Sequence, residues 1–233
     1  MKTLFLLALA LTYSCNVPVL SGETIKETRD VGPFSSISLA MAADVYLTQG
    51  PVQKVVIEGD KSSLEKIETI VSDEKLKIET KNHWGGNIGK ITIYITVPEI
   101  NGLTVAGSGD ISTQSAIKTD ELDMNVSGSG SIHFKELSVR EASATITGSG
   151  NIDIASGQAE NEMDVEITGS GSFSGEGFTA QEVEVTITGS GSAMVWAVKE
   201  LDTTITGSGN VGYKGSPQVN ANSTGSGKTH SIQ

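Results

Sequence analysis

The chain of 233 residues is near the length of one ordinary domain, but it holds 27 glycines against 5 prolines. Its 28 acidic and 16 basic residues give a formal net charge of -12, which argues against nucleic acid and anionic lipid as partners, since both bind basic surfaces. Hydrophobic residues make up 37% and aromatic residues 5%, so a long, thin aliphatic core is expected instead of a thick globular one.

Residues 1–22 are expected to be an export leader followed by a linker. Lys2 precedes the apolar run 4–11, which is too short to span a bilayer and is typical of a secretory signal. The only cysteine, Cys15, follows in a segment that resembles the lipobox of a bacterial lipoprotein, although Tyr13 fits it poorly. We expect lipidation at Cys15, membrane contact only through that anchor, and an outer-membrane or cell-surface address. Cleavage after Ser21 would instead leave a periplasmic or secreted protein.

Residues 23–103 are expected to form the first coils of a solenoid and the cap at its end. Short apolar runs predict strands at 37–39, 44–48, 55–59, 76–80 and 91–97, and residues 62–70 have a helical pattern. A cap is expected because an open solenoid end exposes unpaired backbone groups.

Residues 104–233 contain a repeat. The tripeptide Gly-Ser-Gly begins at positions 107, 128, 148, 169, 189, 207 and 225, in steps of 18 to 21 residues. Apolar residues alternate with polar ones before each copy, and an apolar residue follows four positions after each of the first six, so every coil has two strands joined at a glycine corner. The repeat predicts an all-β fold, a single-stranded right-handed parallel β-helix with coils of about 20 residues.

Equal offsets in successive coils predict columns of side chains. Val126, Ile146, Ile167 and Ile187 share one offset and are expected to lie over one another in the core. Glycine at the corner indicates a positive φ or a close backbone approach that excludes a Cβ atom.

Several motifs give the chain a resemblance to a known family. Residues 31–37 (VGPFSSI), 44–50 (DVYLTQG) and 97–100 (VPEI), with Gly107 to Asp110 after them, resemble the putative auto-transporter adhesin, head GIN-domain family, and the resemblance covers roughly residues 27 to 227. It implies a right-handed β-helix in an exported bacterial protein of largely uncharacterised function. The family offers no catalytic residues to carry over.

Acidic residues recur at two outward offsets, seven and five positions before the tripeptide. The first offset holds Glu121, Glu141, Glu162, Glu182 and Glu200, and the second holds Asp123, Ser143, Asp164, Glu184 and Asp202. Like charges on rungs about 4.8 Å apart repel by about 0.9 kcal/mol in water. These two columns are therefore a candidate face for Ca²⁺ or a cationic partner. The alternative is that the acids keep an exposed sheet soluble.

No catalytic constellation is visible, because His83, His133 and His230 lie far apart and no nucleophile elbow is present. We expect a cell-envelope or secreted adhesin-like binding module that is not an enzyme, needs no cofactor apart from a possible Ca²⁺, and binds a glycan or a surface protein. One alternative is a structural or assembly protein of the envelope that forms homo-oligomers. The other is a glycan-active β-helix enzyme, a lyase or hydrolase.

Overall fold

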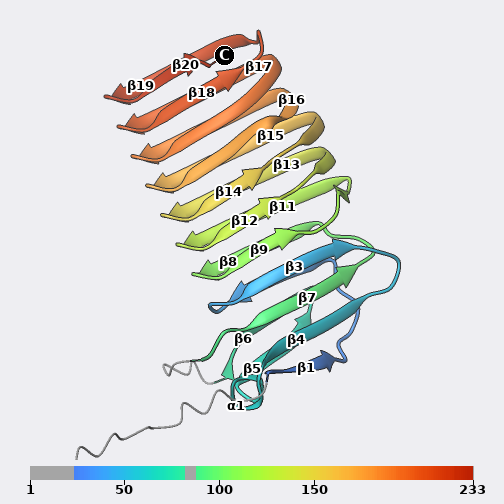
Figure 1. Cartoon of the computed structure of the whole chain (residues 1–233). Coiled ribbons are helices and arrows are strands. Elements are labelled where there is room, and N and C mark those ends of the chain that lie inside the picture. Colours follow the sequence, from blue (N-terminus) through green and yellow to red (C-terminus); the bar gives the residue numbers. More distant parts are fainter. Residues whose placement is uncertain (1–23, 82–87, 233) are drawn as a thin grey trace, which may run out of the picture.

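The computed structural model describes residues 24–81 and 88–232 and shows a solenoid of stacked strands (Figure 1). It is a β-solenoid of about six turns, with parallel coils about 20 residues apart, as the repeat predicts. The N-terminal part contains β1 (Thr24–Arg29), β2 (Ser36–Ala40), β3 (Asp44–Gln49), β4 (Lys54–Asp60), α1 (Lys61–Leu64), β5 (Ile67–Ser72), β6 (Lys75–Thr80) and β7 (Thr92–Val97).

The repeats form the remaining strands. These are β8 (Gly102–Gly107), β9 (Asp110–Thr113), β10 (Ile117–Lys118), β11 (Glu121–Gly128), β12 (Ser131–Phe134), β13 (Leu137–Gly148), β14 (Asn151–Ile154), β15 (Gly157–Gly169), β16 (Ser172–Gly189), β17 (Ser192–Gly207), β18 (Asn210–Lys214), β19 (Gln218–Gly225) and β20 (Lys228–Ser231).

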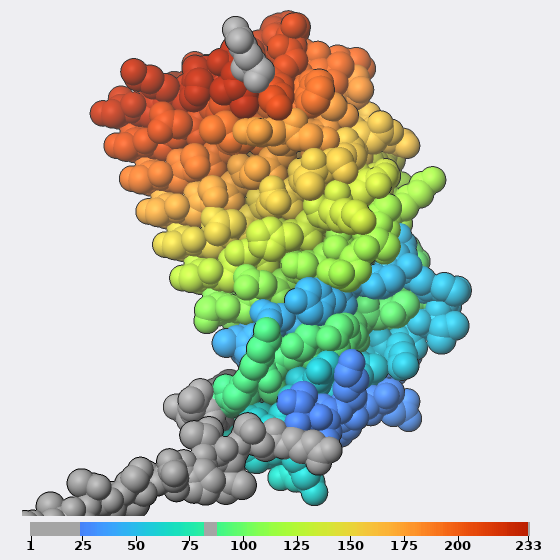
Figure 2. Space-filling model, in the orientation of Figure 1, coloured from blue at the N-terminus to red at the C-terminus, as the bar shows by residue number. Residues whose placement is uncertain are grey.

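Parallel pairing arranges these strands into walls of the solenoid. The first wall runs in the order β6, β2, β8, β11, β13, β15, β16, β17, β19. The second wall runs in the order β7, β3, β9, β12, β14, β16, β17, β18, β20. The N-terminal strand β3 thus lies between β7 and β9, which is why blue and green bands alternate at that end in Figure 2.

The core is a set of aliphatic columns. Ile167 pairs in register with Ile146 on one side and with Ile187 on the other, and the same column continues to Val126 and Ile205. All five side chains are at most 1% exposed. The predicted stacking of these residues is therefore confirmed.

The first glycine of each tripeptide forms the corner between the two walls. Gly107, Gly128, Gly148 and Gly169 have φ of +122°, +119°, +117° and +119°, in a region that side-chain-bearing residues rarely adopt. A Cβ atom on Gly169 would also lie 2.5 Å from the carbonyl oxygen of Gly148 in the coil below. The corner therefore requires glycine for both reasons that the sequence indicates, a positive φ and a close approach of the neighbouring backbone.

Antiparallel pairing occurs only near the N-terminal end of the described residues. There β4 pairs antiparallel with β1 and β7, and β5 forms a hairpin with β6. Strands β2 and β3 nevertheless stack in parallel on β8 and β9, so the hydrophobic core continues from the repeats into this part.

The helical expectation for residues 62–70 is mostly wrong. Helix α1 covers only Lys61–Leu64, and its first turn is capped by Asp60, whose carboxylate accepts a hydrogen bond from the backbone N–H of Ser63. From Ile67 the chain is a strand, because pairing of its β-branched residues with β6 overrides the local pattern. No helix in the described ranges is long or apolar enough to cross a bilayer, and Cys15 lies outside those ranges.

Candidate binding face

The two acidic columns lie on the outer surface of the first wall. Pairing in register stacks Glu121, Glu141, Glu162, Glu182 and Glu200, and the column ends at Gln218. The second column stacks Asp123, Ser143, Asp164, Glu184 and Asp202, and ends at Asn220. All of these side chains are exposed or half-buried, so the structure brings together every acidic residue that the sequence singles out.

Arg140 partly compensates the negative charge of the first rungs of the glutamate column. Its guanidinium pairs with Asp120 at 3.0 Å and with Glu121 at 2.5 Å, and it also pairs with Glu141. The hydrogen bond from Arg140 lowers the pKa of Asp120, and the pKa of Arg140 rises in turn. Sequence reasoning missed this role, although an arginine directly before Glu141 lies one coil away from Glu121 and could have signalled it.

The middle of the two columns lacks this compensation. Carboxylate oxygens of Glu162, Asp164 and Glu184 lie within 4.8 Å of one another. The negative charge of Asp164 raises the pKa of Glu162, and partial burial raises the pKa of Asp164. No ion pair within residues 24–81 and 88–232 involves these three side chains. Repulsion on this face is therefore concentrated around the β15 and β16 rungs.

These three carboxylates could hold a divalent cation. Oxygen atoms are the ligands that Ca²⁺ prefers, and it takes about six to eight of them. Three side chains supply only part of such a shell, so water or a bound ligand would have to supply the rest.

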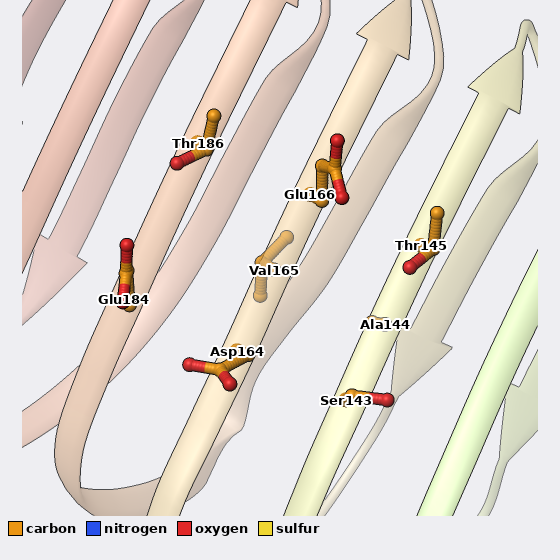
Figure 3. Close-up of a pocket in the computed structure, with 8 residues that line it drawn as sticks. All are labelled: Ser143, Ala144, Thr145, Asp164, Val165, Glu166, Glu184 and Thr186. Carbon is orange, nitrogen blue, oxygen red and sulfur yellow. The ribbon is translucent and has the colours of Figure 1, made fainter.

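A hollow lies beside the carboxylates on the same surface (Figure 3). Its volume is about 470 Å³, and its rim carries Ser143 and Thr145 of β13, Asp164 and Glu166 of β15, and Glu184 and Thr186 of β16. In Figure 3 these side chains project from neighbouring strands of one wall. The hollow is lined by carboxylates and hydroxyls, and Ala144 and Val165 contribute only backbone to its floor, because their side chains are buried in the core.

Further hollows continue along the first wall in both directions. One of about 150 Å³ shares Ser143 and Asp164 with the first, and another of about 280 Å³ shares Glu121 and Asp123 with the second. A hollow of about 530 Å³ lies between Asp202 and Asn222 at the β19 end. We call the outer surface of the first wall, with this row of hollows, the groove face.

The sequence did not point to all residues of the groove face. A third outward column lies three positions before each tripeptide and contains Thr104, Asn125, Thr145, Glu166, Thr186, Thr204 and Asn222. Its regular offset from the tripeptide could have identified this column from the sequence. Ser36 and Lys75, which line the hollow at the β2 and β6 end, could not be found this way because their strands precede the repeat.

Neutralising Glu162 is expected to stabilise the fold at neutral pH. The pKa values of Glu162 and Asp164 are raised in the folded state, so these two side chains favour folding most when they are protonated. This contribution to stability is complete below the ordinary carboxyl pKa of about 4, and it is lost as the pH rises through the raised pKa values. Glu162→Gln removes a repulsion of about 1 kcal/mol, so the melting temperature at pH 7 should rise by about 2–4 °C, and the gain should disappear near pH 3.

Circular dichroism melting at both pH values measures this effect. Glu121→Gln is the matched control from the same column, and it should not stabilise the fold, because Glu121 pairs with Arg140. A lower melting temperature for Glu162→Gln at pH 7, or an equal gain at pH 3, would contradict the expectation.

Solved structures of bacterial proteins resemble this fold. A putative adhesin from Bacteroides fragilis NCTC 9343 is 25% identical, with a TM-score of 0.85 over 90% of this chain and 97% of that one. A putative lipid binding protein from Parabacteroides distasonis ATCC 8503 is 22% identical, with a TM-score of 0.75 over 91% and 98% of the two chains. A putative adhesin from Parabacteroides merdae ATCC 43184 is 23% identical, with a TM-score of 0.73 over 91% and 97%. The last two likenesses concern the fold alone.

Among curated proteins, none matches this chain. The model of one protein family does match, over residues 33–217, and this range includes strands β2 to β18 and most of the groove face. The resemblance that the motifs at 31–37, 44–50 and 97–100 indicate is thereby confirmed. The chain belongs to the putative auto-transporter adhesin, head GIN domain family.

Proposed function

We propose that this protein is a binding module of the bacterial cell envelope, and that its groove face holds an extended glycan along the solenoid axis. The observation that carries the proposal is the row of hollows on the first wall, lined in register by carboxylates, hydroxyls and amides. The family description, which names an adhesin, agrees with a binding role and with an exported or surface location.

The lining of the groove favours a neutral or amino-bearing glycan. Sugar hydroxyls donate hydrogen bonds to carboxylates such as Asp164 and Glu184, and these charge-assisted bonds are stronger than neutral ones. Thr186 and Asn222 add groups that both donate and accept. An anionic polysaccharide would be repelled by the acidic columns, and an acyl chain would meet charged and hydroxyl groups instead of an apolar surface.

The length of the groove favours a polymer over a single sugar. Nine strands separated by about 4.8 Å give the first wall a length of roughly 40 Å. Because the coils stack rigidly, neighbouring rungs offer equivalent groups at a fixed spacing, and each further sugar unit of a chain can make similar contacts. Affinity should therefore increase with chain length until the ligand spans the wall.

Lipidation at Cys15 is part of the proposal, since an anchor there would fix the module at an outer-membrane or cell-surface site.

We propose binding without catalysis. One observation favours the alternative of a glycan-active enzyme: Glu162, Asp164 and Glu184 lie close together. Glycoside hydrolases use two nearby carboxyl groups for catalysis. Release of reducing ends from a bound polysaccharide would support that alternative.

A panel of immobilised polysaccharides tests the proposed function. Neutral and amino-bearing glycans should retain the purified protein, while uronic-acid and sulfated glycans should not. The double variant Asp164→Ala, Glu184→Ala should weaken binding at least about tenfold, since each hydrogen bond to a charged group contributes about 1.5–3 kcal/mol.

Asp153→Ala is the matched control, because Asp153 is a half-exposed carboxylate on the second wall, away from the groove face. It should bind like the unchanged protein. Equal retention of the double variant, or preferential retention on acidic polysaccharides, would overturn the assignment of the groove face.

A further inference from the structure

Charged side chains and a helix close the N-terminal end of the second wall, whereas the first wall ends at β5, which among the described residues pairs only with β6. On the edge strand β1, Glu27 and Arg29 pair with Ile57 and Val55 of β4 and therefore lie on the core side. The two charges pair with each other at 3.3 Å, and Arg29 donates a hydrogen bond to the backbone carbonyl of Leu64 in α1. Inward-pointing charges and a covering helix are devices that prevent an edge strand from pairing with another chain.

The opposite end has none of these devices. Within residues 24–81 and 88–232, β19 pairs only with β17 and β20 pairs only with β18 (Figure 1). Val219, Ala221 and Ser223 continue the core columns below them, yet Val219 is only half-buried and the other two are exposed. This edge therefore presents free backbone donors and acceptors, and uncharged residues occupy its core-side positions.

The charge pattern changes at the same end. Residues 218–232 contain no aspartate or glutamate, whereas the chain as a whole has a net charge of -12. The two acidic columns end in amides there, Gln218 and Asn220. Two copies of the chain would repel each other along their acidic walls, but residues 218–232 have no acidic side chain that could face the approaching copy.

We propose that two copies of this chain associate tail to tail, with the β19 edge of one copy pairing antiparallel with the β19 edge of the other. A twofold axis through this pair makes the contact isologous and closed. A head-to-tail contact would instead bring the β20 edge against β1, whose core-side positions carry Glu27 and Arg29. The groove faces of the two copies then continue into one another, although the association does not depend on what the groove binds.

Sedimentation velocity of the exported protein carrying Cys15→Ser tests the proposal without interference from a lipid. A concentration-dependent monomer–dimer equilibrium is expected. Ala221→Lys places a charge on the core side of β19 and should raise the dissociation constant at least about tenfold, because the lysine would be buried without a partner. Ala221 is exposed in the single copy, so the melting temperature of the monomer should stay unchanged.

Val52→Lys is the matched control, because Val52 is 71% exposed in the segment between β3 and β4. This variant should dimerise like the unchanged protein. A monomer at every concentration, or undiminished dimer in Ala221→Lys, would overturn the proposal.

A cross-linking experiment tests the orientation of the two copies. In the Cys15→Ser background, Asn222→Cys places a thiol on β19 and should give a covalent dimer with a short thiol-reactive cross-linker. Val52→Cys should not, since the two copies of that segment would lie at the far ends of the assembly. The reverse result would exclude the tail-to-tail arrangement.

Discussion

Gly169→Ala is expected to destabilise the protein by about 2–6 kcal/mol, because the added methyl group meets both backbone strain and a steric overlap. The φ of +119° at Gly169 strains any residue with a Cβ atom, at a cost of about 1–3 kcal/mol. The added carbon would also lie 2.5 Å from the carbonyl oxygen of Gly148, and relieving that overlap costs about 1–3 kcal/mol more. Denaturant unfolding followed by circular dichroism measures the sum.

Two other glycines separate the contributions. Gly107 has a φ of +122°, but no atom lies within 4 Å of the position that a Cβ atom would take there, so Gly107→Ala should show the backbone strain alone. Gly32 has neither a positive φ nor a close neighbour, and Gly32→Ala should change stability by less than about 0.5 kcal/mol. If Gly169→Ala and Gly107→Ala lose the same stability, the backbone approach between coils is not what restricts the corner.

The contrast between Gly169 and Gly107 shows how far the sequence determines this fold. The repeat offset alone places Ile146 over Val126 and Glu141 over Glu121, because parallel strands in register carry equal offsets into equal positions. The same offset cannot show that Gly107 lacks a close neighbour, since the coil that it faces comes from the non-repetitive residues before it.

The groove face likewise contains residues that the sequence predicts and residues that it does not. Its acidic columns follow from periodicity, but the ion pairs of Glu121 and Glu141 depend on the rotamer of Arg140, which no spacing reveals. Ser36 and Lys75 reach the groove face because β2 and β6 join the first wall through contacts distant in sequence. The antiparallel pairs of β4 likewise depend on long-range partners, which local patterns do not encode.

Ile167→Ala is expected to cost about 2–5 kcal/mol, because it opens a cavity in the middle of the aliphatic column. Ile167 is 0% exposed and is enclosed by Ile146 and Ile187 on the adjacent rungs. In a solenoid each coil is stabilised mainly by its neighbours, so a cavity at the centre weakens two interfaces at once. Chemical denaturation should show a lower midpoint, and a broadened transition would indicate that the two halves unfold separately.

The position of the cavity along the column provides the control. Ile205 has the same side chain and is 1% exposed, but the next residue in its column, Ser223, belongs to the uncovered last coil and is itself exposed. In the monomer the end coil can relax into the vacated space or separate from the stack, so at protein concentrations too low for dimerisation Ile205→Ala should cost less than Ile167→Ala. The exposed neighbour Thr168→Ala should change stability by less than about 0.5 kcal/mol. Equal losses at Ile167 and Ile205 would mean that the last coil is held as firmly as the central ones, a result that only a covered C-terminal edge can explain.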